Sequence, residues 1–168
     1  MAFWIVGIGL ALALVGMAAY VIGARLPEEH SVEASAFIAN RTPPIVAARI
    51  RDVEHCSVWR RGVSAVVVMR DVSSVTFEET GSNGKVTYRQ TAPKPNAEII
   101  NEIISDGMPY GGKWTIRIES INGGSTVSIR EDGFVKPPMF RFLARFVFGY
   151  SGSINQFLKD LAEAERVL

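Results

Sequence analysis

The sequence predicts an α+β fold, in which about six to seven antiparallel strands are covered by one long C-terminal helix. Three observations support this prediction. The 168-residue chain ends in a long amphipathic segment, residues 137–168. Its middle alternates apolar and polar residues between short glycine turns, which is the pattern of half-buried strands. Its beginning is an uncharged run, which predicts an additional N-terminal transmembrane helix.

The N-terminal run covers residues 3–24 and contains no charged side chain. This length suffices to cross a hydrocarbon core of about 30 Å. Trp4 and Tyr20 lie near its ends, where membrane helices carry interfacial aromatic residues. A cleaved signal peptide is the alternative, but that class has a basic start and a shorter apolar core. We therefore expect a single-pass membrane anchor over residues 1–24, a short tether over 25–29 and one domain over 30–168.

Two further expectations concern this anchor. No Lys or Arg precedes the run and Arg25 follows it at once, so the positive-inside rule places the domain in the cytoplasm. Gly9, Gly16 and Gly23 recur every seven residues, and small residues on one face let membrane helices approach closely. Weak self-association through these glycines is therefore one interpretation. The other is that glycine is common in membrane helices in any case.

The domain begins with a strand and two short helices. Residues 30–39 alternate small apolar and polar side chains and predict a half-buried strand. Pro43 and Pro44 suit the first turn of a helix over residues 45–51. Residues 52–61 predict a second short helix or a turn.

Antiparallel strands and tight turns fill the next part of the domain. The Asn83-Gly84 pair is a strong hairpin signal, and the Val-rich run 63–70 predicts a buried strand. Turns this short produce a meander of neighbouring strands. Its apolar face needs cover, which only the last helix is long enough to supply. The strands are expected at residues 63–70, 75–80, 85–91, 98–105, 113–121 and 125–131.

The last segment, residues 137–168, has apolar residues at steps of mostly three and four, as on one face of a helix. A continuous helix of this length would be a rod of roughly 45 Å. Glycine is unfavourable inside a helix, and residues 149–153 read GYSGS. We interpret this stretch as a kink or a break into two helices. The alternative is that its small side chains leave room for a ligand beneath the helix.

The order of these elements resembles the helix-grip fold of the START-like, polyketide-cyclase and Bet v 1-like superfamily (SRPBCC). Four phrases carry the resemblance: P-x-x-V at 43–46, W-R-x-G-V at 59–63, G-K-W at 112–114 and E-D-G-x-V-K-x-P-x-F-R-F-L at 131–143. The resemblance implies a curved antiparallel sheet that wraps the C-terminal helix and encloses an apolar cavity. It also implies lipids, sterols, polyketides or other apolar molecules as ligands. Some members of the superfamily are cyclases or dehydratases, and some act through protein partners.

The composition excludes several kinds of site. Lys and Arg number 18 against 17 Asp and Glu, so the net charge of +1 gives no bulk attraction to nucleic acid. One cysteine and two histidines leave no material for an intramolecular disulfide or a multi-cysteine metal site. One of the histidines, His30, has no acidic or cysteine partner at ligand spacing. We therefore expect no nucleic-acid partner, no metal and no cofactor.

The sequence contains none of the usual catalytic combinations of side chains. His55 and Cys56 are adjacent and diverge on a helix, so we expect a surface histidine and a buried cysteine. Glu78 and Glu79 point to opposite faces of a strand and cannot act as a pair. We interpret residues 131–133 (EDG) as a bend before the last helix rather than as an acid–base site. No catalytic residue is therefore assigned.

The apolar interior remains as the candidate site. The hydroxyl groups of Tyr88 and Tyr150 would need partners if buried, and they are suited to hold the polar end of a ligand. For each aromatic residue, a filled core is the alternative interpretation. The candidate cavity residues are Trp59, Tyr88, Trp114, Ile116, Phe142, Phe146, Gly149, Tyr150 and Ser153.

The leading hypothesis is a membrane-anchored module that binds a lipid or other apolar small molecule between sheet and C-terminal helix, without catalysis. The first alternative is a polyketide cyclase-like or dehydratase-like enzyme, which needs polar groups that converge in the cavity. The second alternative is a non-catalytic interaction protein at the membrane, with a solid core and an exposed apolar patch.

Overall fold

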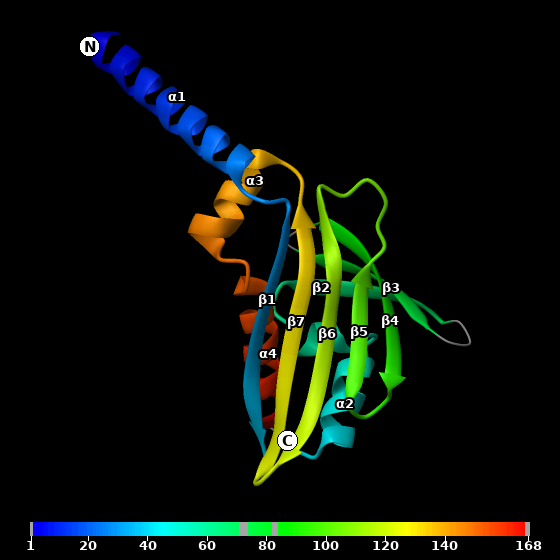
Figure 1. The fold of residues 1–168 in the computed structure, drawn as a ribbon. Coiled ribbons are helices and arrows are strands. Elements are labelled where there is room, and N and C mark those ends of the chain that lie inside the picture. Colours follow the sequence, from blue (N-terminus) through cyan, green and yellow to red (C-terminus); the bar gives the residue numbers. More distant parts are fainter. Residues whose placement is uncertain (1, 71–73, 82–83, 167–168) are drawn as a thin grey trace.

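The computed structural model describes residues 2–70, 74–81 and 84–166, and it contains one seven-stranded antiparallel sheet (Figure 1). The apolar helix α1 (Ala2–Arg25) projects from one end of the domain. Helices α2 (Pro43–Arg51) and α4 (Gly152–Arg166) cover one face of the sheet. This arrangement confirms the predicted α+β helix-grip fold.

Seven strands make the sheet: β1 (Glu29–Ala39), β2 (Val63–Arg70), β3 (Val75–Gly81), β4 (Gly84–Lys94), β5 (Glu98–Ile103), β6 (Tyr110–Ile121) and β7 (Gly124–Val135). From β2 to β7 each strand pairs with the next one, as predicted for a meander. β1 returns beside β7, so the order is β1-β7-β6-β5-β4-β3-β2. The first and last strands of the sequence are therefore neighbours in space, with Glu29 opposite Phe134 and Ala39 opposite Gly124.

The core lies between the sheet and the helices α2 and α4. The alternation predicted for β1, β6 and β7 is confirmed, since Ile38, Ile116 and Ile129 are at most 1% exposed. Val46 of α2 and Leu161 of α4 pack in the same cluster and are fully buried. Burial of each such side chain contributes roughly 1.5–3 kcal/mol relative to exposure in water. The core therefore fastens both helices to the sheet.

The C-terminal segment forms two helices rather than one rod. α3 (Pro138–Leu143) continues into a π-helical turn, η2 (Ala144–Phe148), and α4 begins only at Gly152. Between them Gly149 has a φ of 72°, which residues with a side chain rarely adopt. The interpretation of residues 149–153 as a break is confirmed, and the continuous rod is wrong. The reason is that α3 packs against α1 whereas α4 packs against β1, so the two halves cover different surfaces.

The predicted burial of β2 is wrong. β2 is an edge strand of the sheet, and Val67 and Met69 are 62% and 57% exposed. A run of valines indicates strand structure, but only the position in the sheet decides whether that strand is covered.

Two further predictions concern residues 52–61, expected to form a short helix or a turn, and the Asn83-Gly84 hairpin turn. Residues 52–61 contain one 3₁₀ turn, η1 (Cys56–Val58), and no longer helix. Of the predicted Asn83-Gly84 turn, Asn83 lies outside the described residues. Gly81 and Gly84 pair as flanking positions of β3 and β4, in agreement with a hairpin.

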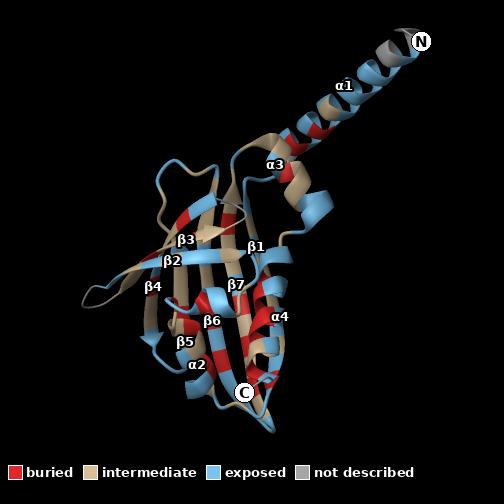
Figure 2. Cartoon of the chain, turned by 180° about the vertical axis from the view of Figure 1, so that it is seen from behind, coloured by how far each residue is buried: buried red, intermediate tan, exposed pale blue. Residues whose placement is uncertain are grey.

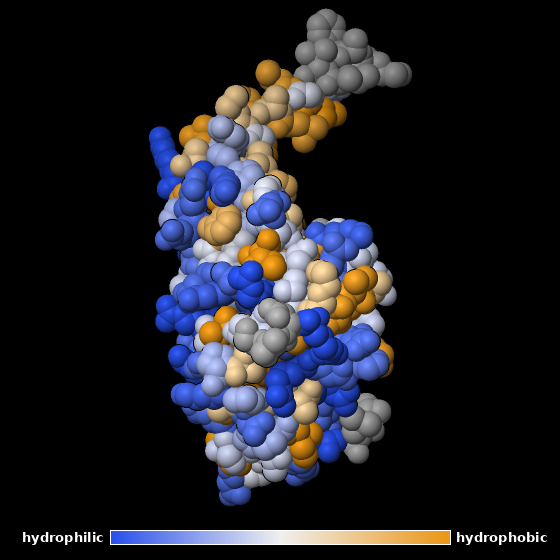
Figure 3. Space-filling view, turned by 90° about the vertical axis from the view of Figure 1, so that its right-hand side faces the viewer, coloured by the Kyte–Doolittle hydropathy of each residue, from blue (hydrophilic) through white to orange (hydrophobic). Residues whose placement is uncertain are grey.

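Among the described residues, α1 is the one helix long and apolar enough to cross a membrane. A signal sequence near an N-terminus meets the same criteria of length and hydropathy, so the retained anchor stays a prediction. α1 is exposed along most of its length (Figure 2). Figure 3 shows apolar surface gathered on it above a largely hydrophilic face of the domain.

Of the three glycines considered for self-association, Gly23 already has a neighbour in the same chain. A Cβ atom at Gly23 would overlap the backbone carbonyl of Pro138 in α3. At Gly9 and Gly16 the same atom would meet open space. α3 therefore occupies the end of the glycine face nearest the domain, and self-association of the remainder stays a prediction.

Candidate functional site

A cavity of about 430 Å³ lies between the sheet and the first turns of α4. Its apolar wall includes Phe77 of β3, Trp114 of β6 and Phe157 of α4. Polar and charged side chains also line it. The interior of the domain is thus partly hollow, which is not the solid core expected of a pure interaction protein.

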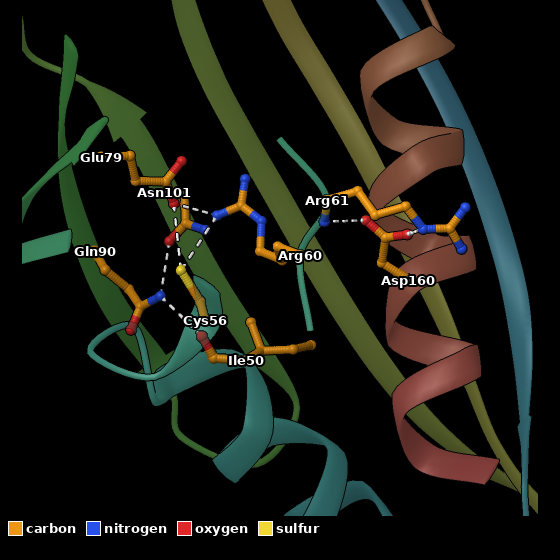
Figure 4. A network of polar contacts seen from close by, with 8 residues as sticks. All are labelled: Ile50, Cys56, Arg60, Arg61, Glu79, Gln90, Asn101 and Asp160. Carbon is orange, nitrogen blue, oxygen red and sulfur yellow. Dashed lines mark hydrogen bonds and ion pairs between the residues drawn. The ribbon is translucent and has the colours of Figure 1, made fainter. Parts of the chain in front are cut away.

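An ion pair occupies one side of the cavity. Arg60, which follows η1, pairs with Glu79 of β3 (Figure 4). Glu79 is 7% exposed, and the guanidinium carbon of Arg60 lies 5.3 Å from the centre of the Phe157 ring. Burial alone lowers the pKa of Arg60, but the Glu79 carboxylate and Cys56 outweigh it, so this pKa is raised. The guanidinium therefore remains charged inside the wall.

Cys56 packs against this ion pair. Its Sγ atom lies 3.8 Å from Oε1 of Glu79 and 3.9 Å from Nη1 of Arg60. Desolvation raises the pKa of the Cys56 thiol to about 11, against the opposing effect of Arg60. The thiol is therefore unreactive near neutral pH. The prediction of a buried cysteine beside a surface histidine is confirmed, since the side chain of His55 is 68% exposed.

Tyr88 of β4 lines the same cavity. The ring stacks on Phe77 with 5.3 Å between centroids. Burial, and after it the charge of Glu79, raise the pKa of the Tyr88 hydroxyl. It therefore stays protonated and can donate a hydrogen bond to a ligand.

Glu131 of β7 lines the cavity as a hydrogen-bonded carboxylate. Trp114 donates from Nε1 to Oε2 at 2.7 Å, and Ser153 lies 3.5 Å from the same oxygen. His30 of β1 lies 3.1 Å from Oε1 through its Nε2, and its ring stacks on Tyr150 with 4.2 Å between centroids. This group joins β1, β6, β7 and α4 at one point.

Two sequence-based interpretations are therefore wrong. Residues 131–133 are not a bend, because they continue β7 in register with β1 and β6. His30 does have an acidic partner, although Glu131 is 101 residues away along the chain. The alternation of β7 carried a signal for this, since Glu131 has the same parity as the inward-facing Val127 and Ile129.

The other side of the cavity is tied to α4. The backbone N–H of Arg61 donates to Oδ2 of Asp160 at 2.9 Å, and its side-chain Nε lies 3.0 Å from Oδ1. Gln156 donates to the same carboxylate at 2.7 Å. Figure 4 shows that Arg60 and Arg61 point in opposite directions, one to Glu79 on the sheet and one to Asp160 on the helix. The two consecutive arginines bridge sheet and helix at the wall of the cavity.

One carboxylate of the wall, Glu131, is not paired with a Lys or Arg among the described residues. Arg60 pairs with Glu79 and Arg61 with Asp160. Within the described part of the chain, Glu131 has no Lys or Arg at ion-pair distance, and His30 is its neighbour. The lining of the cavity therefore includes both an acceptor, Glu131, and a residue with a donor hydroxyl, Tyr88.

The nine residues proposed from the sequence fall into three groups. Tyr88, Trp114 and Ser153 line the cavity. Trp59 makes an edge contact with Phe157 behind the wall, and Ile116 is fully buried in the core. The remaining four belong to the α3–α4 segment and do not line the cavity: Phe142 packs on Phe146, Gly149 is exposed, and Tyr150 stacks on His30.

Sequence reasoning missed most of the charged wall. Arg60, Glu79, Glu131 and Asp160 were not proposed, because a charged side chain is normally expected on the surface. Across the described residues, no group of three or more His, Cys, Asp or Glu is arranged to hold a metal ion.

Solved structures with the same fold span most of this domain. A START superfamily protein from Mycobacterium smegmatis has a TM-score of 0.64 and 14% identity, over 82% of this chain and 98% of that one. The Zhui aromatase/cyclase from Streptomyces sp. R1128 has a TM-score of 0.68 and 11% identity, over 82% and 94%. The di-domain aromatase/cyclase StfQ of the steffimycin biosynthetic pathway has a TM-score of 0.64 and 15% identity, over 83% of this chain.

These similarities show a START-like fold. The chain spans about half the length of StfQ, of which 52% is covered. No protein-family model matches the sequence, and no curated protein matches it. Site chemistry therefore has to be argued from the residues of this chain.

Proposed function

We propose that this chain is a membrane-anchored module that binds one small amphipathic molecule in the cavity between sheet and α4. The observation that carries the proposal is the combination of a hollow interior with Glu131 in its wall. A filled core would leave no place for a ligand, and a purely apolar cavity would not orient one.

The size of the cavity limits the ligand. Small-molecule pockets in proteins span about 300–1,000 Å³, and this one is about 430 Å³. Such a volume suits a single acyl chain or a compact ring system. A two-chain phospholipid would have to leave much of its length outside.

The polarity of the wall limits the ligand further. Glu131 has no Lys or Arg at ion-pair distance among the described residues and is paired with His30, so a ligand hydroxyl or amine is favoured there. A ligand carboxylate would meet a like charge, which disfavours free fatty acids. The apolar body of the ligand would lie along Phe77, Trp114 and Phe157.

The tether supports an inference about the source of the ligand. Arg141 of α3 donates from Nη1 to the carbonyl of Leu26 at 2.9 Å and lies 3.5 Å from Glu28. The domain therefore sits directly at the end of α1, without a free linker. If α1 spans a bilayer, the cavity takes its ligand from that bilayer or its surface.

Native mass spectrometry of the full chain, purified in detergent, tests this function. We expect a bound small amphiphile with a hydroxyl or amine group, and its loss in Glu131→Lys. Glu119→Lys is the matched control, since Glu119 is exposed on the opposite face of β6. A chain that is empty in repeated preparations, and whose Trp fluorescence does not respond to added long-chain alcohols or amines, would contradict the proposal.

A second candidate function is an enzyme, and one observation favours it. Glu131 and His30 form a carboxylate–imidazole pair at 3.1 Å, which is an arrangement suited to proton transfer. Glu131→Gln would then abolish conversion of the co-purified molecule while leaving its binding intact. If incubation of that molecule with the native chain yields no product, the enzymatic candidate is excluded and the binding function stands alone.

A further inference from the structure

A group of large apolar side chains is exposed where α3 turns toward α4. Phe140, Phe146, Val147 and Phe148 are between 55% and 70% exposed. Phe146, Val147 and Phe148 lie in the π-helical turn η2, which presents three consecutive apolar residues to the outside. We call these four residues the exposed aromatic segment. In Figure 2 the end of this segment appears as a pale-blue turn beside the domain.

The position of this segment relative to α1 is fixed by packing. α3 packs against α1, and Gly23 of α1 lies so close to Pro138 that no side chain fits there. Arg141, which is 7% exposed, donates to the carbonyl of Leu26 at 2.9 Å. The exposed aromatic segment therefore lies at the C-terminal end of α1, where the apolar run of the chain ends (Figure 1).

Basic side chains accompany the exposed aromatic segment. Arg145 lies within η2, Lys136 precedes α3 and Arg25 ends α1, and all three are exposed. Of the acidic groups on the tether, Glu28 is paired with Arg141 and Glu29 begins β1. Phenylalanines flanked by Lys and Arg are the composition that favours the boundary between lipid headgroups and acyl chains.

We propose that the exposed aromatic segment inserts into the interfacial layer of the same bilayer that α1 spans. Phe140, Phe146 and Phe148 then lie at the boundary between headgroups and acyl chains, while Arg25, Lys136 and Arg145 bind anionic headgroups. This inference rests on the anchor of the proposed function, but not on any ligand. Continuity with the apolar surface of α1 and the basic flank favour lipid over a protein partner as the occupant.

This docking would also set the orientation of the cavity. Tyr110 lines the cavity and pairs with Val135, which lies just before α3. The Tyr110 end of the cavity is therefore the end nearest the exposed aromatic segment along the sheet. With that segment in the bilayer, the Tyr110 end faces the lipid surface, so an amphiphile could pass between bilayer and cavity over a short path.

Site-directed spin labelling of the full chain in vesicles tests the docking. In a Cys56→Ala background, single labels are placed through Phe148→Cys in η2, Leu12→Cys in the middle of α1 and Asn122→Cys in the β6–β7 turn at the opposite end of the sheet. Vesicles are made of phosphatidylcholine with and without phosphatidylglycerol. The measurement is the accessibility of each label to oxygen, which concentrates in the bilayer, and to a water-soluble nickel complex.

We expect labels at 148 and 12 to be accessible to oxygen and protected from nickel, and the label at 122 to behave in the opposite way. Phosphatidylglycerol should deepen the label at 148, and Arg145→Glu should reverse that gain, whereas Arg117→Glu on β6 should not. A label at 148 that reads as aqueous while the label at 12 reads as buried would overturn the docking and leave the anchor intact. An aqueous label at 12 would overturn both, and spin–spin broadening at 148 would assign the segment to a second copy instead.

Discussion

Arg60 and Glu79 form an ion pair that is more than three-quarters buried on both sides, with 21% and 8% of the two side chains exposed. Removing one partner of a buried pair is costly, because the remaining charge loses its compensation. We expect Glu79→Leu alone to destabilise the domain by about 3–5 kcal/mol, toward the lower end because Arg60 is partly exposed. The double variant Arg60→Met/Glu79→Leu should cost less than this single change.

Chemical unfolding of the full chain in detergent, followed by Trp fluorescence, measures these differences. The comparison is a double-mutant cycle with Arg60→Met as the third variant. If the two single changes add up to the double one, the pair is not coupled and the account of the wall is wrong.

Cys56 gives a second prediction at this scale, through its pKa of about 11 against an ordinary value of 9.0. Below pH 9 the thiol is protonated in both the folded and the unfolded chain, so its contribution to stability is complete. Above pH 9 the unfolded thiol ionises first, and the folded state loses this contribution as the pH rises through about 11. Between pH 8 and pH 10.5 the free energy of unfolding should therefore fall more for the native chain than for Cys56→Ala.

The same shift predicts slow modification of the thiol. The thiolate fraction of folded Cys56 is roughly 100-fold lower than that of an ordinary thiol, at ten-fold per pKa unit. Alkylation at pH 7.5 should be slow in the native chain and fast after denaturation. Equal rates in both states would show that Cys56 is not in the environment described.

Individual residues were predictable where the local pattern decides their environment. Strand alternation separates Glu78 from Glu79, and helix or turn geometry separates His55 from Cys56. The same alternation places Glu131 with Val127 and Ile129. The His30 partner of Glu131 was not predictable, because the β1–β7 pairing that joins them is a property of the whole sheet.

At the scale of elements, the break between α3 and α4 depends on one glycine. Gly149 has a φ of 72° and no atom near the position of a Cβ, so Gly149→Ala meets backbone strain but no clash. We expect a cost of about 1–3 kcal/mol, because a φ of 72° with a ψ of 142° lies in a region that is essentially restricted to glycine. Gly152→Ala is the matched control, since Gly152 also has open space around it but begins α4.

The control should be neutral or slightly stabilising, because alanine is the better helix former by up to about 1 kcal/mol. Thermal unfolding by circular dichroism compares the two variants. Equal effects of both substitutions would mean that the break at Gly149 does not need its positive φ.

The sequence predicted an element well when all of its inward-facing residues pack against one surface. The alternation in β1, β6 and β7 faces one core, and their faces are confirmed. The apolar repeat over residues 137–168 also looks continuous, but α3 meets α1 whereas α4 meets the sheet. Periodicity indicates that a residue is covered but does not identify the surface that covers it. The break between α3 and α4 was therefore predictable only from the GYSGS stretch.

For the molecule as a whole, the site is assembled from segments that lie far apart in the sequence, and the pairing of β1 with β7 adds His30 beside Glu131. The cavity draws Arg60 from the segment after η1, Glu79 from β3, Glu131 from β7 and Asp160 from α4. Of these four residues only Arg60 has a sequence neighbour, Arg61, in the lining of the cavity. The resemblance to START-like proteins supplied the architecture, and the chemistry of the wall came from pairings that no local pattern encodes.

One residue, Arg25, is expected to decide the orientation of the molecule in a membrane. Arg25 ends α1 and is the first basic residue of the chain, so the positive-inside rule predicts a cytoplasmic domain. Fused to the C-terminus in bacteria, green fluorescent protein should fluoresce, and alkaline phosphatase should be inactive, because its disulfides form only after export. Three lysines inserted before Phe3 together with Arg25→Glu should reverse both signals, whereas three inserted serines with Arg25 retained should not. An active phosphatase on the native chain would place the domain outside the cytoplasm, and the cavity would then take its amphiphile from the outer leaflet.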